Sequence, residues 1–195
     1  DNVLEAIDLL GTAGGIGHKN LVFSTVGDAR AFELLPLGRV KPALALSLHS
    51  TKAALRERLL PRAPRIAPHD LVAQAEDYAR ATGYPLQVQW TLLAGVNDGA
   101  DEIDGLVQLL GGRHAVLNLI PYNTVPGLPF DRPDGEHAAA MARALHRRGV
   151  LTKLRRSAGQ DVEAGCGQLR ARGAGGAQPV HVQPRAARSS SPTMR

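Results

Sequence analysis

Strand-like apolar runs alternate with amphipathic helical segments along most of this chain, and this alternation limits its fold more than any other feature. The sequence predicts strands at 21–27, 42–49, 85–93, 115–120 and 150–155. Helical periodicity appears at 1–10, 28–35, 52–60, 69–82, 100–110 and 135–148. Strands that alternate with helices form parallel sheets with right-handed crossovers. The chain is therefore expected to be an α/β protein of four or five βα units.

Two of the predicted strands carry informative patterns. Residues 42–48 are almost continuously apolar, which is typical of a strand buried on both faces. In the run 85–93, Val88, Trp90 and Leu92 share one face. Such patterns predict a central sheet that helices cover.

The net charge of +5 does not belong to the folded part of the sequence. Residues 1–169 hold 18 basic and 18 acidic side chains, whereas residues 170–195 hold five Arg and no acid. The last segment is rich in Ala, Gly, Pro, Arg and Ser and has few large apolar residues to offset the entropy of ordering it. We therefore expect one domain over 1–169 and a disordered tail over 170–195.

The sequence predicts a cytoplasmic protein that is not embedded in a membrane. No apolar run approaches the roughly 20 residues that span a bilayer, and the first residues lack the pattern of a signal peptide. Cys166 is the sole cysteine, so it forms no internal disulfide. It lies between Gly165 and Gly167, and a lone thiol is either inert packing or a single reactive sulfur.

Polar residues follow or end several predicted strands. Ser24, Ser47, His49 and Asn123 lie at the carboxyl ends of strands, where α/β barrels and open sheets bind ligands. A residue of this kind also ends a strand by bonding to loop backbone, so each one alone has two interpretations. Neither G-x-G-x-x-G after the first strand nor G-x-x-x-x-G-K-[ST] occurs, which argues against a dinucleotide or P-loop site.

Basic residues form two bands, which fit either a phosphate backbone or a solvated helix face. The bands consist of Lys52, Arg56, Arg58, Arg62 and Arg65, and of Arg143, Arg147, Arg148, Lys153, Arg155 and Arg156.

Five motifs, in order and at these spacings, resemble the radical S-adenosylmethionine (SAM) adenine-C2 RNA methyltransferases of the RlmN/Cfr family. They are L-V-F-S-T-V-G at 21–27, A-L-S-L-H at 45–49, L-A-G-V-N-D at 93–98, N-L-I-P-Y-N at 118–123 with P-G at 126–127, and D-V-E-A-G-C-G-Q-L at 161–169. The resemblance covers residues 1–169. It implies a partial (β/α) barrel of the radical SAM type.

The resemblance also implies roles for individual residues. Ser24, the run Ser47, Leu48 and His49, and Asn123 correspond to residues that hold SAM in the family. Cys166 corresponds to the cysteine that carries a methyl group, which becomes a carbon radical and adds to C2 of an adenine. The implied partner is RNA, namely 23S ribosomal RNA and in some members transfer RNA, and we expect a monomer.

The sequence departs from the family pattern in several respects, including the lack of a second cysteine, and the cluster site is the most important of them. The C-x-x-x-C-x-x-C motif that binds the family's 4Fe-4S cluster is absent, and one cysteine cannot supply three thiolate ligands. We therefore expect the C-terminal part of such an enzyme, without the first two barrel strands and inactive on its own. The strand that begins at residue 21 should then have an unpaired edge, and the first helix should lack part of its cover.

Two other interpretations remain open at this level. One is a homologue without catalytic activity that contacts structured RNA through the two basic bands. The other is an unrelated α/β barrel enzyme in which His49 acts as a base and an acid such as Asp98 orients it.

Overall fold

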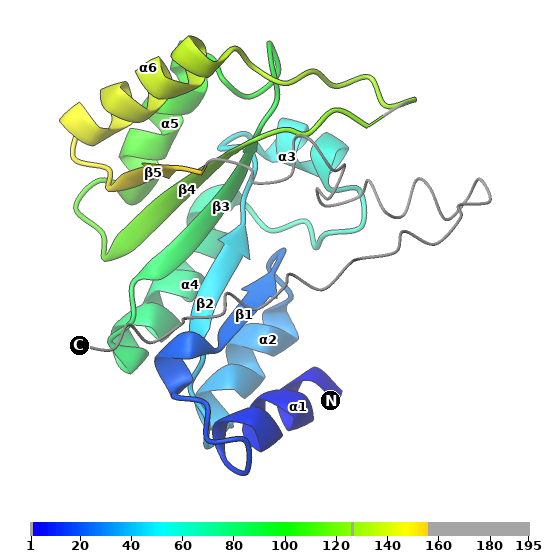
Figure 1. Cartoon of the computed structure of the whole chain (residues 1–195), viewed down its shortest axis with the longest axis vertical. Helices are drawn as coiled ribbons and strands as arrows, with labels where there is room; N and C mark the ends of the chain where they lie inside the picture. The colour runs from blue at the N-terminus through cyan, green and yellow to red at the C-terminus, as the bar shows by residue number, and fades with distance from the viewer. Residues whose placement is uncertain (1, 126, 156–195) are drawn as a thin grey trace, which may run out of the picture.

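A parallel five-stranded sheet organises the computed structural model, which describes residues 2–125 and 127–155 (Figure 1). The strands lie side by side in the order in which they occur along the chain. Their bounds are β1 Val22–Thr25, β2 Ala43–Ser47, β3 Leu86–Leu92, β4 Ala115–Pro121 and β5 Thr152–Leu154. Each strand pairs in parallel with the next, from Val22 opposite Ala43 to Leu119 opposite Leu154.

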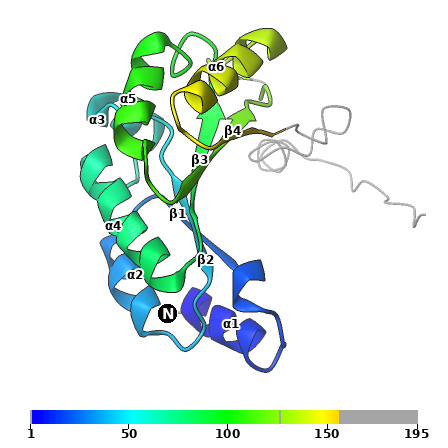
Figure 2. The same cartoon turned by 90° about the vertical axis from the view of Figure 1, so that its left-hand side faces the viewer.

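In the described part of the chain, one helix precedes the first strand and the other five lie between consecutive strands. The helices are α1 Asn2–Gly11, α2 Ala29–Leu34, α3 Ala53–Leu59, α4 Pro68–Thr82, α5 Ala100–Leu110 and α6 Gly135–Arg147, with two 3-10 turns at His18–Asn20 and Leu35–Leu37. Right-handed crossovers between strands that advance in one direction place the connecting helices on one face of the sheet. Figure 2 shows α2, α4 and α5 stacked along that face. This arrangement is an open portion of a (β/α) barrel, as the sequence predicts.

The core lies between the sheet and these helices. In β3 the residues alternate, with Leu86, Val88, Trp90 and Leu92 buried and the residues between them partly exposed. They belong to one apolar cluster with residues of α4 such as Leu71. Burying a side chain of this size contributes about 1.5–3 kcal/mol, so the alternation itself fixes which face of β3 meets the helices.

Local signals explain where several elements begin and end. The Asp28 carboxylate accepts a hydrogen bond from the Arg30 backbone N–H and caps α2, and Asp134 caps α6 in the same way. Gly27, just before α2, has φ +102, and a Cβ there would lie 2.2 Å from Leu71 Cδ1. Only glycine fits this turn, which ends the first strand segment.

The predicted strands and helices are confirmed to within two residues at their ends. The two 3-10 turns were not predicted, because such short turns have no hydrophobic period of their own. The predicted tail, 170–195, lies outside the described residues. No helix in the described part of the chain is long and apolar enough to cross a membrane.

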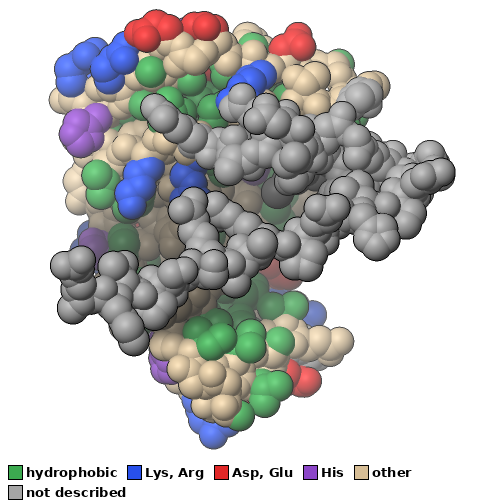
Figure 3. Space-filling view, viewed as in Figure 1, with side chains coloured by type: hydrophobic (Ala, Val, Ile, Leu, Met, Phe, Trp, Pro, Cys, Tyr) green, Lys and Arg blue, Asp and Glu red, His purple; other side chains and the backbone are tan. Residues whose placement is uncertain are grey.

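The β1 side of the molecule is thinly covered. Strand β1 is at the end of the strand order, so within the described residues it pairs on one side only. Helix α1 buries none of its residues fully, and Val3 and Leu9 are 59% and 62% exposed. Figure 3 shows hydrophobic side chains gathered at this end of the face it displays. Among the described residues, β1 therefore has the expected unpaired edge and α1 lacks part of its cover.

Candidate functional site

The polar residues predicted at strand ends lie at one edge of the sheet. Ser24 is near the end of β1, and it pairs with Ala45, two residues before Ser47 at the end of β2. His49 lies two residues after the end of β2, and Asn123 lies two residues after the end of β4. Because the strands are parallel and neighbouring, their carboxyl ends meet at this edge, and the structure brings the four residues to the same rim.

His49 is held in an unusual backbone conformation. Its φ is +60°, the one positive value among non-glycine residues in the described part of the chain. The Ser50 N–H donates to the Leu48 carbonyl over 2.9 Å, which closes a three-residue turn around His49. Such conformations cost of order 1–3 kcal/mol and persist where the surroundings impose them, often at functional sites.

The environment of the His49 ring defines its charge and tautomer. The Thr91 backbone N–H donates to His49 Nδ1 over 2.9 Å. Burial, with a smaller effect of the nearby positive charge of Arg56, lowers the pKa of His49 to about 4. The imidazole is therefore neutral near pH 7, and because Nδ1 accepts a hydrogen bond, the ring proton is on Nε2. The site presents an N–H donor without a charge.

Asn97 secures the turn around His49 from the next loop. Its amide Nδ2 donates to the carbonyls of His49 and Thr91, each over 2.8 Å, and its Oδ1 accepts from the Leu93 N–H over 2.8 Å. The Asn97 side chain is fully buried. Both Nδ2 and Oδ1 of Asn97 are therefore hydrogen-bonded, and the side-chain amide links the ends of β2 and β3 rigidly.

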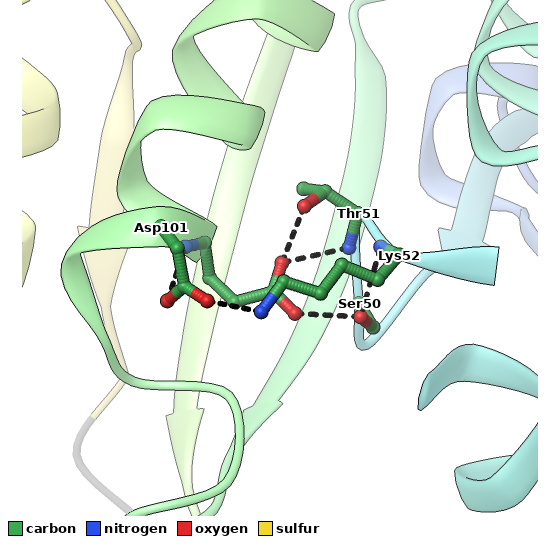
Figure 4. Close-up of polar contacts among 5 residues, drawn as sticks. Ser50, Thr51, Lys52 and Asp101 are labelled. Atoms are coloured by element: carbon green, nitrogen blue, oxygen red, sulfur yellow. Dashed lines mark hydrogen bonds and ion pairs between the residues drawn. The ribbon is translucent and has the colours of Figure 1, made fainter. Parts of the chain in front are cut away.

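Glu102 in the first turn of α5 holds the residues that follow His49 (Figure 4). Glu102 is fully buried. Its carboxylate accepts a hydrogen bond from Ser50 Oγ over 2.6 Å. It accepts two more from Thr51, one from the backbone N–H over 2.8 Å and one from Oγ1 over 2.5 Å. Beside it, Lys52 pairs with the exposed Asp101. Helix α5 thus fixes the β2–α3 loop through one buried carboxylate.

Leu48 and Asn123 are placed differently from the serines. The Leu48 side chain is fully buried in the core cluster, and its N–H and carbonyl bond to Gln89 and Ser50. Its side chain anchors the end of β2 in the core and offers no hydrogen-bonding group to a ligand at the rim. Asn123 Oδ1 lies 3.4 Å from Arg132 Nη1, so the loop after β4 orients the amide.

A row of polar residues crosses the sheet face that is turned away from the core cluster. Register places Ser47 beside Gln89, Gln89 beside Asn118, and Asn118 beside Lys153. The sequence alone singled out Ser47 as a site residue and placed Lys153 in a basic band, but it did not predict that these residues form a row. The signal was available, because the apolar set in 86–92 alternates with Gln87, Gln89 and Thr91, and the second face of a barrel strand lines the barrel interior.

The proposed pairing of His49 with Asp98 is not present. Asp98 Oδ1 accepts from the Gly95 N–H over 2.9 Å, and Oδ2 lies 3.2 Å from His137 Nε2. His49 Nδ1, the atom that an orienting acid would contact, accepts from Thr91 instead. An arrangement in which Asp98 orients His49 as a general base is therefore excluded in this structure.

Arg56 corrects the interpretation of the first basic band. It is 3% exposed, and its guanidinium donates to the Val26 carbonyl just after β1. Burial lowers the pKa of this guanidinium from its ordinary value. Arg56 is thus not part of a solvated helix face but a cation beneath the rim formed by β1 and β2.

The rim offers unused hydrogen-bonding groups that suit a polar ligand such as SAM. Within the described part of the chain, the hydroxyls of Ser24 and Ser47 and Nε2 of His49 make no hydrogen bond. The buried Tyr122 hydroxyl, next to Asn123, also lacks a partner among the described residues. These groups fit SAM, which carries hydroxyl, amine, carboxylate and adenine groups.

The residues do not fit an iron–sulfur cluster. The whole sequence contains one cysteine, and the residues described include no group of His, Cys, Asp and Glu side chains that could hold a metal ion. Cys166, the predicted methyl carrier, lies outside the described residues.

The chain is similar in sequence to proteins named as probable RNA methyltransferases. No protein-family model matches it. It is 77% identical over 184 residues, 94% of its length, to a probable RNA methyltransferase of Methylibium petroleiphilum, and covers 52% of that protein. It is 67% identical over 193 residues, 99% of its length, to a probable RNA methyltransferase of Azoarcus sp., and covers 54% of that protein.

A solved structure agrees with these sequence matches. The chain resembles a radical SAM methyltransferase from Sphaerobacter thermophilus with a TM-score of 0.76 and 34% identity, over 84% of this chain and 48% of that one. The chain spans about half the length of the curated relatives it matches. By sequence the chain is thus similar to proteins named as probable RNA methyltransferases, and by fold it is similar to a radical SAM methyltransferase.

Proposed function

We propose that the protein containing this chain methylates C2 of an adenine in 23S ribosomal RNA, or in transfer RNA, using SAM and a methyl group carried on Cys166. The observation that carries the proposal is the rim itself, where Ser47 and the constrained, neutral His49 end β2 beside Ser24 of β1. The relatives named as RNA methyltransferases support RNA as the substrate. We further propose that the protein acts in the cytoplasm as a monomer.

The chain's own residues bind and orient the cofactor in this proposal. The His49 Nε2–H donates a hydrogen bond to an acceptor of SAM, and the Ser24 and Ser47 hydroxyls bond to its polar groups. Asn123, oriented by Arg132, binds from the end of β4. SAM supplies the methyl group. Because His49 is neutral, it adds no positive charge beside the sulfonium, which a protonated ring would repel.

Leu48 contributes to the same site without touching the ligand through its side chain. By filling the core and continuing the hydrogen bonding to Gln89, it fixes where Ser47 and His49 lie. Cofactor binding by this stretch is therefore a property of the turn as a whole.

The iron–sulfur cluster of the family has no ligands in this chain, so we derive no step that passes through it. The relatives are about twice as long, and activity has to be tested on a full-length protein.

The test is isotope-traced RNA methylation. Full-length protein, prepared anaerobically with its cluster, is incubated with ribosomal RNA and with transfer RNA in the presence of SAM carrying a deuterated methyl group. Nucleoside mass spectrometry should detect labelled 2-methyladenosine in at least one RNA. A Cys166→Ala variant should form none. Label at any other atom, or equal labelling by the variant, would refute the proposal.

A further inference from the structure

A pocket opens between α3 and the segment that leads to α4, at the end of the sheet to which the strand arrows point in Figure 1. Its volume is about 260 Å³. We call it the Arg56 pocket, and its lining residues are Ala53, Arg56, Glu57, Leu60 and 63–67. It lies beside the rim but shares no lining residue with the four rim positions Ser24, Ser47, His49 and Asn123.

Arg56 in this pocket is a buried cation that has no counter-ion among the residues that the structure describes. The carbonyl of Val26 is its hydrogen-bond partner, and the buried Nε has none in the described part of the chain. No ion pair joins Arg56 to a carboxylate within residues 2–125 and 127–155. A buried charge without a counter-charge is strongly unfavourable, so the arrangement calls for an anion.

The surroundings of the pocket are positive. Arg65 is 82% exposed and pairs with Glu57 over 2.5 Å, which uses the single acid of this segment. Arg58 and Arg62 form no ion pair with a described residue. An exposed pair such as Arg65 with Glu57 is weak in water, so Arg65 is free to turn toward a stronger anion.

The lining combines this charge with apolar walls from Leu60, Pro64 and Ile66. Apolar walls exclude water and strengthen the attraction between a guanidinium and an anion. Arginine binds phosphate in a planar fork with two N–H donors, which distinguishes it from lysine as a phosphate ligand.

We propose that the Arg56 pocket binds a backbone phosphate of the RNA substrate, with Arg56 at its floor and Arg65 at its mouth. The inference rests on the proposed function, since RNA is the anion that such an enzyme must hold beside its rim. A phosphate there would neutralise Arg56 and anchor the strand while an adenine reaches the SAM site.

The test measures how salt weakens RNA binding by the full-length protein. Fluorescence anisotropy with a labelled oligoadenylate gives the slope of log K against log salt concentration, which counts the phosphates in contact. The variants are Arg56→Met and Arg65→Gln. Each should reduce the slope by about 1 and weaken binding by several-fold at low salt.

Arg39→Gln is the matched control. Arg39 is 77% exposed and pairs with Asp8 over 2.7 Å, so it resembles Arg65 in exposure and pairing. It lies before β2, at the amino ends of the strands, away from the rim. Its variant should keep the wild-type slope. Arg56→Met removes a buried bond to Val26, and if it fails to fold, the comparison of Arg65→Gln with Arg39→Gln decides the question.

Other outcomes would overturn the inference. Equal slopes for wild type, Arg65→Gln and a folded Arg56→Met would show that the pocket meets no phosphate. A loss of SAM affinity in Arg56→Met with unchanged RNA binding would assign the anion to the cofactor instead. If the wild-type protein itself neither bound nor methylated RNA, the proposed function would fail rather than the pocket assignment alone.

Discussion

At the scale of single residues, His49 makes stability depend on pH. Its pKa is about 4 in the folded protein, below the ordinary value of about 6.5, so the unfolded chain takes up the proton first. The contribution to stability is complete above about pH 6.5 and is lost as pH falls toward 4. At about pH 5 the loss amounts to about 2 kcal/mol.

The His49→Asn variant isolates this effect, because asparagine tolerates a positive φ and does not titrate in this range. Thermal melts of the full-length protein near pH 7 and pH 5 should show a larger fall in Tm for wild type than for His49→Asn. An equal fall in Tm for the two proteins would mean that the His49 ring is not held in a buried, neutral state.

At the scale of structural elements, the β2–α3 loop depends on its clamp from α5. In Glu102→Gln an amide NH2 would face one of the donors from Ser50 and Thr51, at a cost of about 1–3 kcal/mol. We expect lower stability and also a higher Kd for SAM, because the clamp fixes the turn at His49. Denaturant unfolding and calorimetric titration measure the two effects separately.

Asp101→Asn is the control on the same helix. Asp101 is exposed and pairs with Lys52 at the surface, so its variant makes the same change of charge without disturbing the buried clamp. It should leave both quantities near wild type. If Glu102→Gln lost stability while binding SAM normally at a temperature where it is folded, Glu102 would be structural only.

At the scale of the whole molecule, we expect the backbone amides of β3 to be better protected from hydrogen exchange than those of β1. Strand β3 pairs on both sides and carries four fully buried side chains, whereas β1 is the end strand and α1 buries no residue fully. Opening free energies follow such differences in burial. Among the helices and strands that the structure describes, hydrogen exchange should therefore be faster in α1 and β1 than in β3. Equal protection of β1 and β3 would show that β1 has an additional partner.

The fold as a whole could be predicted from the sequence better than the contacts between distant residues. The alternation of elements follows from hydrophobic period, and the position of Ser24, Ser47, His49 and Asn123 at strand ends follows from parallel topology. Their role in binding a ligand stays a prediction. The clamp by Glu102 joins residues 52 positions apart, and local pattern carries no signal for it. The basic band that contains Arg56 fitted either a phosphate backbone or a solvated helix face. The sequence could not show that Arg56 is buried, because burial of a single arginine depends on tertiary contacts.

A crystal structure of the full-length protein with SAM bound would show whether the strand ends hold the cofactor. We expect SAM to lie across the carboxyl ends of β1, β2 and β4, with His49 Nε2 about 2.7–3.2 Å from an acceptor atom of the cofactor. SAM bound elsewhere on the sheet, or a His49 ring turned away from it, would show that these strand ends are not the SAM site.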